Sequence, residues 1–473
     1  MTEEKCYNPL EETSKEVCSM LRRKAYARLL EWKNQERKKA LCIIGARQIG
    51  KTTLVREFGR DNYEHFIELN FVTDPSACAI FDGSLDANTI ITNLSAYTRK
   101  PMEPGNTLIL FDEVQMCPNA RTAIKFLVED GRFDYIESGS LLGVRHKEVR
   151  SYPVGFEEIY RMYPMDFEEY LWANGVQENT IEYLRTCYET LTPVSQAVHE
   201  TMLKLFYSYI VVGGMPDVVQ TYVDTHDIGK VVAVQNDILE LYRLDIAQYA
   251  ENSDKPKIRA IFDSIPAQLN DKNRRFILNH VDPNGRQLRY ANSFEWLSNA
   301  GVALPCYNVT APEAPLQLNE KHNLFKLFFG DVGLLCAACL ENVQFGILQG
   351  KLEINMGSIL ENAMAQQLKS NGLQLHYFDA KKYGELDFVL QNGLRIELME
   401  VKSGNDYKKH AALDKIRKVE EWKTQRAYVF CKGNMEEKNG VTYLPWYQIM
   451  FLKPDAPPKD LIYEIDLSDL NMG

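Results

Sequence analysis

The sequence lacks any apolar run near the roughly 20 residues that a membrane-spanning helix needs. Its first residues, MTEEKC, are acidic and polar, and they lack the apolar core of a secretory signal peptide. These two absences argue against a membrane protein and against a secreted one. We therefore expect a cytoplasmic protein without a membrane partner.

The sequence also lacks the cysteine spacing of a disulfide framework or a zinc site. Its ten cysteines are scattered, and several lie in apolar strand or helix patterns. Cys336 and Cys339 form one CxxC, but it lies in an apolar stretch with no second ligand pair nearby. Reduced thiols are expected, as is usual inside cells.

Basic residues are fewer than acidic residues in this sequence. Asp and Glu number 65 and Lys and Arg 54, which gives a net charge of −11. Indiscriminate binding to nucleic-acid phosphates needs clustered Lys and Arg. The charge balance argues against that mode of binding, although it leaves room for a local basic groove.

A phosphate-binding loop is the strongest feature that is present. The apolar run 40–44 predicts a buried strand, and GARQIGKTT follows it. Its glycines permit a loop whose N–H groups surround a phosphate, Lys51 would reach the β- and γ-phosphates, and Thr52 would ligate Mg²⁺. A helix predicted from residue 54 favours the anion through its dipole. We expect ATP or GTP to contact Gly45, Ala46, Arg47, Gln48, Ile49, Gly50, Lys51, Thr52 and Thr53.

Polar residues end the strands predicted after this loop. Strand candidates at 65–71, 107–113 and 135–140 alternate with helical segments, which predicts a parallel sheet covered by helices. Chemistry in such sheets lies at the carboxyl ends of the strands. Asp112 is placed to hold Mg²⁺ beside Thr52, and Glu113 to activate a water that attacks the γ-phosphate. An acidic helix cap is the alternative for this pair.

Ser138 ends the third of these strand candidates. Its hydroxyl could sense the γ-phosphate. Ordinary turn chemistry explains a Ser–Gly pair equally well, so both interpretations stay open.

Further motifs extend along the chain: SYPVG at 151–155, YPMDFEEYLW at 163–172 and YIVVGGMP at 209–216. Together with GARQIGKTT and LFDEVQ, they resemble a large group of prokaryotic AAA-type ATPases. Members of that group pair an N-terminal ATPase with a C-terminal domain of unknown function that is similar to restriction endonucleases. One departure concerns the arginine finger, because Phe156 stands where a basic residue often follows the glycine. Arg150 and Arg161 are nearby, and the choice stays open.

The middle of the chain, residues 211–335, shows helical patterns followed by strand-like runs at 302–309 and 324–329. Helices followed by a β-hairpin are the plan of a winged helix, and the resemblance implies that module here. Winged helices serve both DNA and protein contacts. The basic residues that could contact phosphates, or simply form a solvated face, are Arg274, Arg275, Arg286 and Arg289.

The C-terminal part carries an acid on one predicted strand and Glu-x-Lys on the next. Asp387 lies in 385–390, Asn392-Gly393 marks a hairpin turn, and Glu400 and Lys402 alternate on the partner strand and share a face. This is the signature of restriction-like nucleases. Asp387 and Glu400 would hold one or two Mg²⁺ ions, and Lys402 would orient the nucleophile or stabilise negative charge.

Glu361, in the first turns of a predicted helix, could complete this metal shell. A salt-bridged surface pair is the alternative for Glu400 and Lys402. The nuclease interpretation therefore depends on the resemblance as well as on the spacing.

The expected fold is α/β: a P-loop NTPase parallel sheet with helices, a winged-helix-like module, and a restriction-endonuclease-like domain. The expected boundaries are 1–210, 211–335, 336–453 and a tail at 454–473. One function is an Mg²⁺-dependent ATPase whose nuclease-like domain acts on or binds DNA. The alternative is an ATP-driven switch or remodelling protein whose nuclease-like domain is catalytically silent and binds a partner. A protein partner at the winged-helix-like module and a homo-oligomer also stay open.

Overall fold

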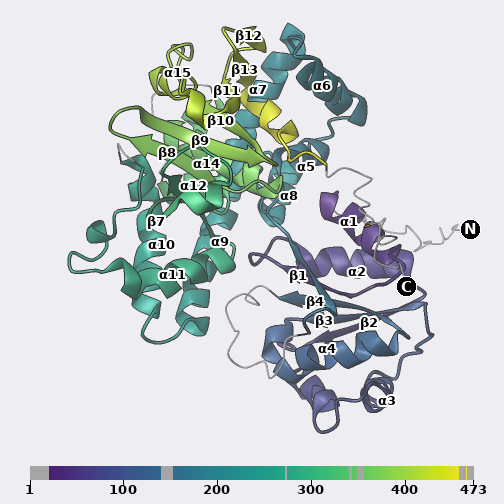
Figure 1. Ribbon diagram of the computed structural model, residues 1–473. Coiled ribbons are helices and arrows are strands. Elements are labelled where there is room, and N and C mark those ends of the chain that lie inside the picture. Colours follow the sequence, from purple (N-terminus) through teal and green to yellow (C-terminus); the bar gives the residue numbers. More distant parts are fainter. Residues whose placement is uncertain are drawn as a thin grey trace, which may run out of the picture.

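The computed structural model describes residues 21–139, 153–271, 274–339, 344–349, 356–456 and 465. Two β-sheets dominate these residues, one in the lower and one in the upper part of Figure 1. Helices from the middle of the chain lie beside the upper sheet. Within the described residues, no helix is both long and apolar enough to cross a membrane.

The first sheet is parallel throughout, with the strand order β2-β3-β4-β1-β5. The two strands that precede the expected functional residues, β1 and β3, are buried along their whole length, as in parallel sheets covered on both faces. This confirms the predicted P-loop-like α/β architecture. The strands are β1 (Ala40–Ile44), β2 (His65–Asn70), β3 (Thr107–Asp112), β4 (Asp134–Gly139) and β5 (Glu157–Arg161).

Alternation along β1 sends its side chains to two separate cores. Leu41 and Ile43 pack in the core that includes α1 and α2, whereas Cys42 packs in the core that includes α3 and α4. Each face of the sheet is therefore covered by its own pair of helices. These helices are α1 (Lys24–Lys33), α2 (Lys51–Asn62), α3 (Ala87–Thr98) and α4 (Pro118–Asp130), and short 3₁₀ turns cover Pro75–Phe81 and Val114–Met116.

The helices that follow the first sheet pack largely against the C-terminal half of the chain. Helix α7 contacts α12, α13 and α14 and the 3₁₀ turn Trp446–Phe451. The middle helices are α5 (Phe167–Ala173), α6 (Glu178–Thr190), α7 (Gln196–Val212), α8 (Pro216–Thr225), α9 (Ile228–Tyr249), α10 (Lys255–Asn270) and α11 (Gln287–Asn299). The later helices are α12 (Val332–Cys339), α13 (Gln344–Leu348), α14 (Met356–Ser370) and α15 (Ala411–Ile416).

The second sheet has eight strands in the order β12-β13-β11-β10-β9-β8-β6-β7. Its central hairpin, β9–β10, turns at Asn392-Gly393 as the sequence predicts, and Gly393 takes a positive φ of 63°. The strands are β6 (Ala303–Val309), β7 (Glu320–Phe329), β8 (His376–Ala380), β9 (Gly384–Asn392), β10 (Arg395–Val401), β11 (Thr424–Cys431), β12 (Glu436–Lys438) and β13 (Val441–Pro445).

The hairpin β6–β7, expected from the sequence to be the wing of a separate winged-helix-like module, belongs to this second sheet. β6 pairs with β8 in parallel, from Tyr307 with His376 to Val309 with Phe378. The expected boundary at residue 335 thus follows two strands that already belong to the C-terminal sheet. The physical reason is that β6 is a mostly buried strand, and its backbone groups need a partner on each side. Of the expected tail, the structure describes 454–456 and 465, and Asp455 binds the side chain of Asn392.

Candidate nucleotide site and a second charged site

The loop between β1 and α2 depends on two glycines for different reasons. A Cβ on Gly45 would lie 2.3 Å from the carbonyl oxygen of Met162, so the close approach of that backbone excludes a side chain. Gly50 takes a left-handed conformation with φ of 84° immediately before α2 begins, which glycine adopts at little cost. The loop expected from the sequence is therefore the loop that forms.

Lys51 is buried within this loop. Its Nζ donates to the carbonyl oxygens of Gly45 at 3.0 Å and Ala46 at 2.7 Å. Burial lowers the pKa of Lys51 to about 8, against the opposing effect of Glu113 and Asp112. An anionic phosphate would offer this ammonium stronger, charge-assisted acceptors than the two neutral carbonyls.

Asp112 is the point at which several strand ends meet. At the end of β3, its carboxylate accepts from Thr52 Oγ1 at 3.0 Å and from Ser138 Oγ at the end of β4. Asn70, at the end of β2, donates its side-chain N–H to the same carboxylate at 2.7 Å. Burial raises the pKa of Asp112. Hydroxyl and carboxylate oxygens at one point are a donor set that suits Mg²⁺.

Asn70 is a residue of this site that was not singled out from the sequence. It ends the strand predicted at 65–71, and the rule that chemistry collects at carboxyl ends of parallel strands applies to it equally. Its side-chain oxygen Oδ1 also accepts from the backbone N–H of Val72 and Thr73, which fixes the orientation of the side-chain amide. A polar residue at the end of this strand was the feature of the sequence from which Asn70 could have been predicted.

Glu113 follows Asp112 in a left-handed conformation, with φ of 53°. It stands at the start of the short 3₁₀ turn Val114–Met116, yet its side chain makes no capping hydrogen bond to the described residues. The carboxylate instead accepts from Gln115 Nε2 at 2.5 Å. A cap therefore does not account for this acid, and its half-buried carboxylate is available for other chemistry.

Two side-chain contacts that the sequence does not predict hold the loop between β1 and α2 in place. Arg23, just before α1, donates to the carbonyl oxygens of Ile49 and Tyr163, each at 2.8 Å. Arg47, within the loop, forms an ion pair of 2.5 Å with Asp245 on α9. These partners lie far away in sequence, so only the folded chain reveals them.

The C-terminal half also touches the loop backbone. Tyr242 on α9 donates its hydroxyl to the carbonyl oxygen of Arg47 at 3.3 Å. A Cβ on Gly301, between α11 and β6, would lie 2.9 Å from the backbone nitrogen of Ala46. The loop between β1 and α2 is thus in direct contact with the second half of the chain.

Only one of the two arginines considered as an arginine finger lies within the described residues. Arg150 lies outside the described residues. Arg161 ends β5 and lines a cavity together with Lys369 and His376 of the C-terminal half. Its assignment as an arginine finger stays a prediction.

A second charged site lies on the C-terminal sheet, where the structure places the predicted acids. Asp387 on β9 accepts from the backbone N–H of Val401 at 2.8 Å, and Glu400 on β10 pairs with Lys402 at 2.6 Å. Burial, and then the neighbouring charge of Asp387, raise the pKa of Glu400 to about 7. Glu361, on α14, is 1% exposed.

Cations of the chain itself compensate the acids at this second site. Lys326 on β7 is fully buried and lies 3.3 Å from Glu361 and 2.6 Å from Glu385. Arg274 contacts Glu361, and its Nη1 lies 3.8 Å from Asp387. Within the described residues, Glu361, Asp387 and Glu400 do not bring one oxygen each to within 4.8 Å of one another. Three basic side chains therefore stand where the sequence predicts divalent ions.

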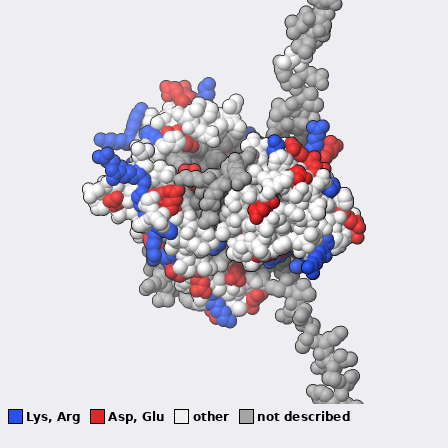
Figure 2. Space-filling model, turned by 90° about the horizontal axis from the view of Figure 1, so that it is seen from below, with Lys and Arg blue, Asp and Glu red and all other residues white. Residues whose placement is uncertain are grey.

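The basic residues considered for phosphate contacts are partly engaged in these pairs. Arg274 lies at the second charged site, and Arg275 pairs with Asp379 at the end of β8. Basic and acidic side chains are interspersed over the face shown in Figure 2. Lys and Arg side chains gather along the left edge of that view, and Asp and Glu side chains lie among them.

Family comparisons agree with the geometry of the loop. Residues 37–171 match the family model of an AAA domain. The chain carries an AAA domain of the P-loop ATPase type. Residues 203–344 match a domain of unknown function, DUF8612, and residues 356–449 match another, DUF4143. No curated protein sequence matches the chain significantly.

The solved structures that match the chain include the Walker-type ATPase PABY2304 of Pyrococcus abyssi. It is 15% identical over 67% of this chain and 96% of its own, with a TM-score of 0.40. The ORC1 protein of Aeropyrum pernix in complex with DNA is 11% identical over 66% of this chain and 90% of its own, with a TM-score of 0.27. The RuvB Holliday junction branch migration motor of Thermotoga maritima is 12% identical over 59% of this chain and 84% of its own, with a TM-score of 0.26.

Proposed function

We propose that this protein binds and hydrolyses ATP with Mg²⁺ at the loop between β1 and α2. The observation that carries the proposal is the convergence of Thr52, Ser138 and Asn70 on Asp112. Three neighbouring strand ends and the start of α2 supply these four side chains. Lys51 lies in the adjoining loop.

In this proposal Lys51 leaves its two loop carbonyls and donates to the β- and γ-phosphates. Thr52 and Asp112 would hold the ion, which would supply positive charge against the phosphates when bound. Glu113 accepts a proton from the attacking water. Ser138, which binds Asp112, is the residue that would respond to the γ-phosphate. Asn70 keeps the Asp112 carboxylate in position through its 2.7 Å hydrogen bond.

We further propose that nucleotide binding is coupled to the C-terminal half through Arg47. This side chain belongs to the loop, yet it pairs with Asp245 on α9, and Tyr242 binds its carbonyl oxygen. Any shift of the loop around a phosphate therefore changes contacts with α9. ATP binding and hydrolysis would then alter the position of the C-terminal half.

For the C-terminal domain we propose that it acts on or binds DNA, and that Arg274 controls its acidic site. Of the two cations on Glu361, Lys326 is fully buried, whereas the Arg274 side chain is 29% exposed. Arg274 is thus the one that a phosphate can draw away. As the side chains stand, the acids are neutralised by Arg274, Lys326 and Lys402.

The same observation favours a second candidate function. If the basic side chains permanently replace divalent ions, the domain is catalytically silent and serves as a partner-binding module of an ATP-driven switch. The buried ion pair of Lys326 with Glu361 supports this alternative.

One experiment separates the two candidates. ATP hydrolysis is measured with and without DNA, beside a cleavage assay with Mg²⁺ or Mn²⁺, for the native protein and for Lys51→Ala and Asp387→Ala. Hydrolysis that requires Lys51 and rises with DNA, with metal-dependent cleavage that vanishes in Asp387→Ala, supports DNA as the substrate. Hydrolysis that requires Lys51 but ignores DNA, without cleavage, supports the silent module. Normal hydrolysis by Lys51→Ala would remove the nucleotide-site assignment.

A further inference from the structure

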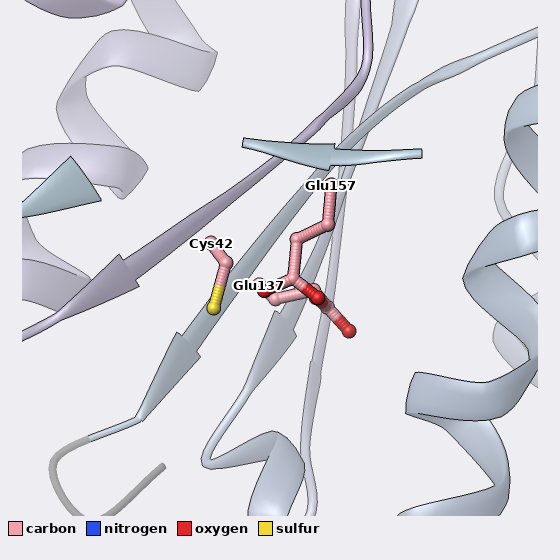
Figure 3. A group of neighbouring side chains, drawn as sticks. All are labelled: Cys42, Glu137 and Glu157. Atoms are coloured by element: carbon pink, nitrogen blue, oxygen red, sulfur yellow. The ribbon is translucent and has the colours of Figure 1, made fainter. Parts of the chain in front are cut away.

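Three side chains that the nucleotide chemistry does not use meet inside the first sheet (Figure 3). Cys42 lies on β1, Glu137 on β4 and Glu157 on β5, and the Cys42 sulfur and one oxygen of each carboxylate all lie within 4.8 Å of one another. The register explains the meeting: Cys42 is paired with Glu137, and Glu157 is paired with Ala40, two residues before Cys42. All three therefore share one face of neighbouring strands.

Burial at this cluster is complete or nearly so. Cys42 and Glu137 are 0% exposed, and the Glu157 side chain is 7% exposed. Arg121 on α4 donates to both oxygens of Glu157, at 2.9 and 3.3 Å. Neither oxygen of Glu137 receives a hydrogen bond from a donor group of the described residues, and its contact is with the Glu157 carboxyl, with which it can share a proton. A buried carboxylate without a donor is costly.

Charge balance shows what the cluster needs. Two carboxylates face one guanidinium, so one negative charge among these four side chains needs compensation. Burial, and then the charge of Glu157, raise the pKa of Glu137, and burial likewise raises the pKa of the Cys42 thiol. Either a proton shared by the carboxylates, or a divalent cation with a Cys42 thiolate, makes the cluster neutral.

We propose that Cys42, Glu137 and Glu157 bind one divalent transition-metal ion of the zinc class. The thiolate supplies one ligand, Glu157 a second, and the two Glu137 oxygens without a donor complete a four-coordinate shell. A thiolate ligand favours zinc-class ions over Mg²⁺ or Ca²⁺. Arg121 holds the Glu157 carboxylate from outside the shell, as outer hydrogen bonds commonly do in metal sites.

The ion would have a structural role. It would join three adjacent strands at a point three positions before Gly45, where the nucleotide loop starts. Because the cluster is buried, the ion enters as the sheet folds.

Cobalt substitution in the full-length, nucleotide-free protein tests this site directly. The protein is produced with Co²⁺, and the expected result is one Co²⁺ per chain together with a sulfur-to-cobalt charge-transfer band. Cys42→Ser should abolish the band, whereas Cys431→Ser, which changes a buried cysteine on β11, should leave it intact. The acids near Asp112 and Asp387 cannot produce this band without a sulfur ligand. A band that persists in Cys42→Ser, or protein that holds no zinc or cobalt, overturns the proposal.

A second variant separates the ion from a shared proton and does not depend on the spectrum. Glu137→Gln keeps the size and the hydrogen-bond donor of a protonated carboxyl, but it replaces one of the two ligand oxygens with an amide nitrogen and removes the negative charge. With a metal site, this variant should lose the ion and several degrees of thermal stability. Equal or higher thermal stability without bound ion in either protein shows a shared proton and overturns the metal assignment.

Discussion

Asp112 and Glu361 are both buried carboxylates, but the chain surrounds them differently. Neutral donors approach Asp112: the hydroxyls of Thr52 and Ser138 and the amide of Asn70. Cations approach Glu361: the ammonium of Lys326 and the guanidinium of Arg274. Neutral donors orient a carboxylate without neutralising it, so its charge stays available for a divalent ion. The cations at Glu361 neutralise the carboxylate, so it does not need a divalent ion.

An acidic cluster therefore does not identify a metal site by itself. Metal binding depends on whether the charge of the acids is already balanced by basic side chains that cannot move away. At Asp112 the neighbours permit an ion. At the second charged site an ion must first displace Arg274, because Lys326 is fully buried. Substitutions at one site at a time test this difference between the two sites.

The largest effect is expected at Lys51. Lys51→Ala removes the ammonium that would bind the β- and γ-phosphates, and ATP hydrolysis should fall by about a hundredfold or more. Steady-state phosphate release measures it. Lys230→Ala, an exposed lysine on α9, is the matched control and should keep the native rate. Equal rates in both variants would place ATP hydrolysis elsewhere.

Glu113→Gln should separate binding from hydrolysis. The amide cannot accept a proton from water, so turnover should fall by about a hundredfold, while ATP affinity stays near the native value. Rapid-quench kinetics and a nucleotide titration measure the two quantities. Asp112→Asn should instead weaken the binding of Mg²⁺ and the dependence of hydrolysis on Mg²⁺. Native turnover in Glu113→Gln would assign the water to another residue.

At the second charged site, Arg274→Ala should convert a compensated site into one that needs an ion. Glu361 and Asp387 then lose their exposed cation, and unfolding free energy should fall by about 1–3 kcal/mol. Mn²⁺ should restore part of the loss in Arg274→Ala but have little effect on the native protein. Thermal unfolding with and without Mn²⁺ measures this, with Arg286→Ala as the control. An Mn²⁺ effect of the same size in all three proteins would remove the distinction between the sites.

The pH dependence of stability should reveal Glu400. Its folded pKa of about 7 lies above its ordinary value of 4.5. The protonated form therefore stabilises the fold fully below about pH 4.5, and this contribution is lost as the pH rises through 7. Glu400→Gln should remove about 1–3 kcal/mol of that decline between pH 5 and 8.

Chemical denaturation at several pH values measures the Glu400 effect. Glu437→Gln, at an exposed position on β12, should keep the native pH profile. A Glu400→Gln profile identical to that of the native protein would show that Glu400 ionises normally.

The smallest effect is expected at the contact between the halves. Asp245→Asn weakens the 2.5 Å ion pair with Arg47 and removes a negative charge close to the loop. ATP affinity should rise by roughly two- to fivefold, in keeping with the modest energy of partly exposed ion pairs. A fluorescent-nucleotide titration measures it, with Asp237→Asn on the exposed face of α9 as the control. Weaker binding in Asp245→Asn alone would mean that the pair supports the nucleotide-bound loop.

The local chemistry of the loop between β1 and α2 could be predicted from neighbouring residues alone. Gly45, Gly50, Lys51 and Thr52 are consecutive or nearly so, and backbone sterics and helix geometry constrain them within a few residues. The parallel sheet, and the meeting of Asp112 with Ser138, followed from strand patterns and from the rule that polar residues collect at strand ends. The turn at Gly393 was equally local.

Tertiary structure alone decided what lies across these elements. β6 could close a wing or extend a sheet, and only its pairing with β8 settles which. Arg274 could face solvent, yet it contacts Glu361, which is 87 positions away in the sequence. Asp245 reaches Arg47, and Glu157 reaches Cys42, for the same reason. Such pairs are set by the packing of whole elements, and no short stretch of sequence encodes the partner of a buried charge.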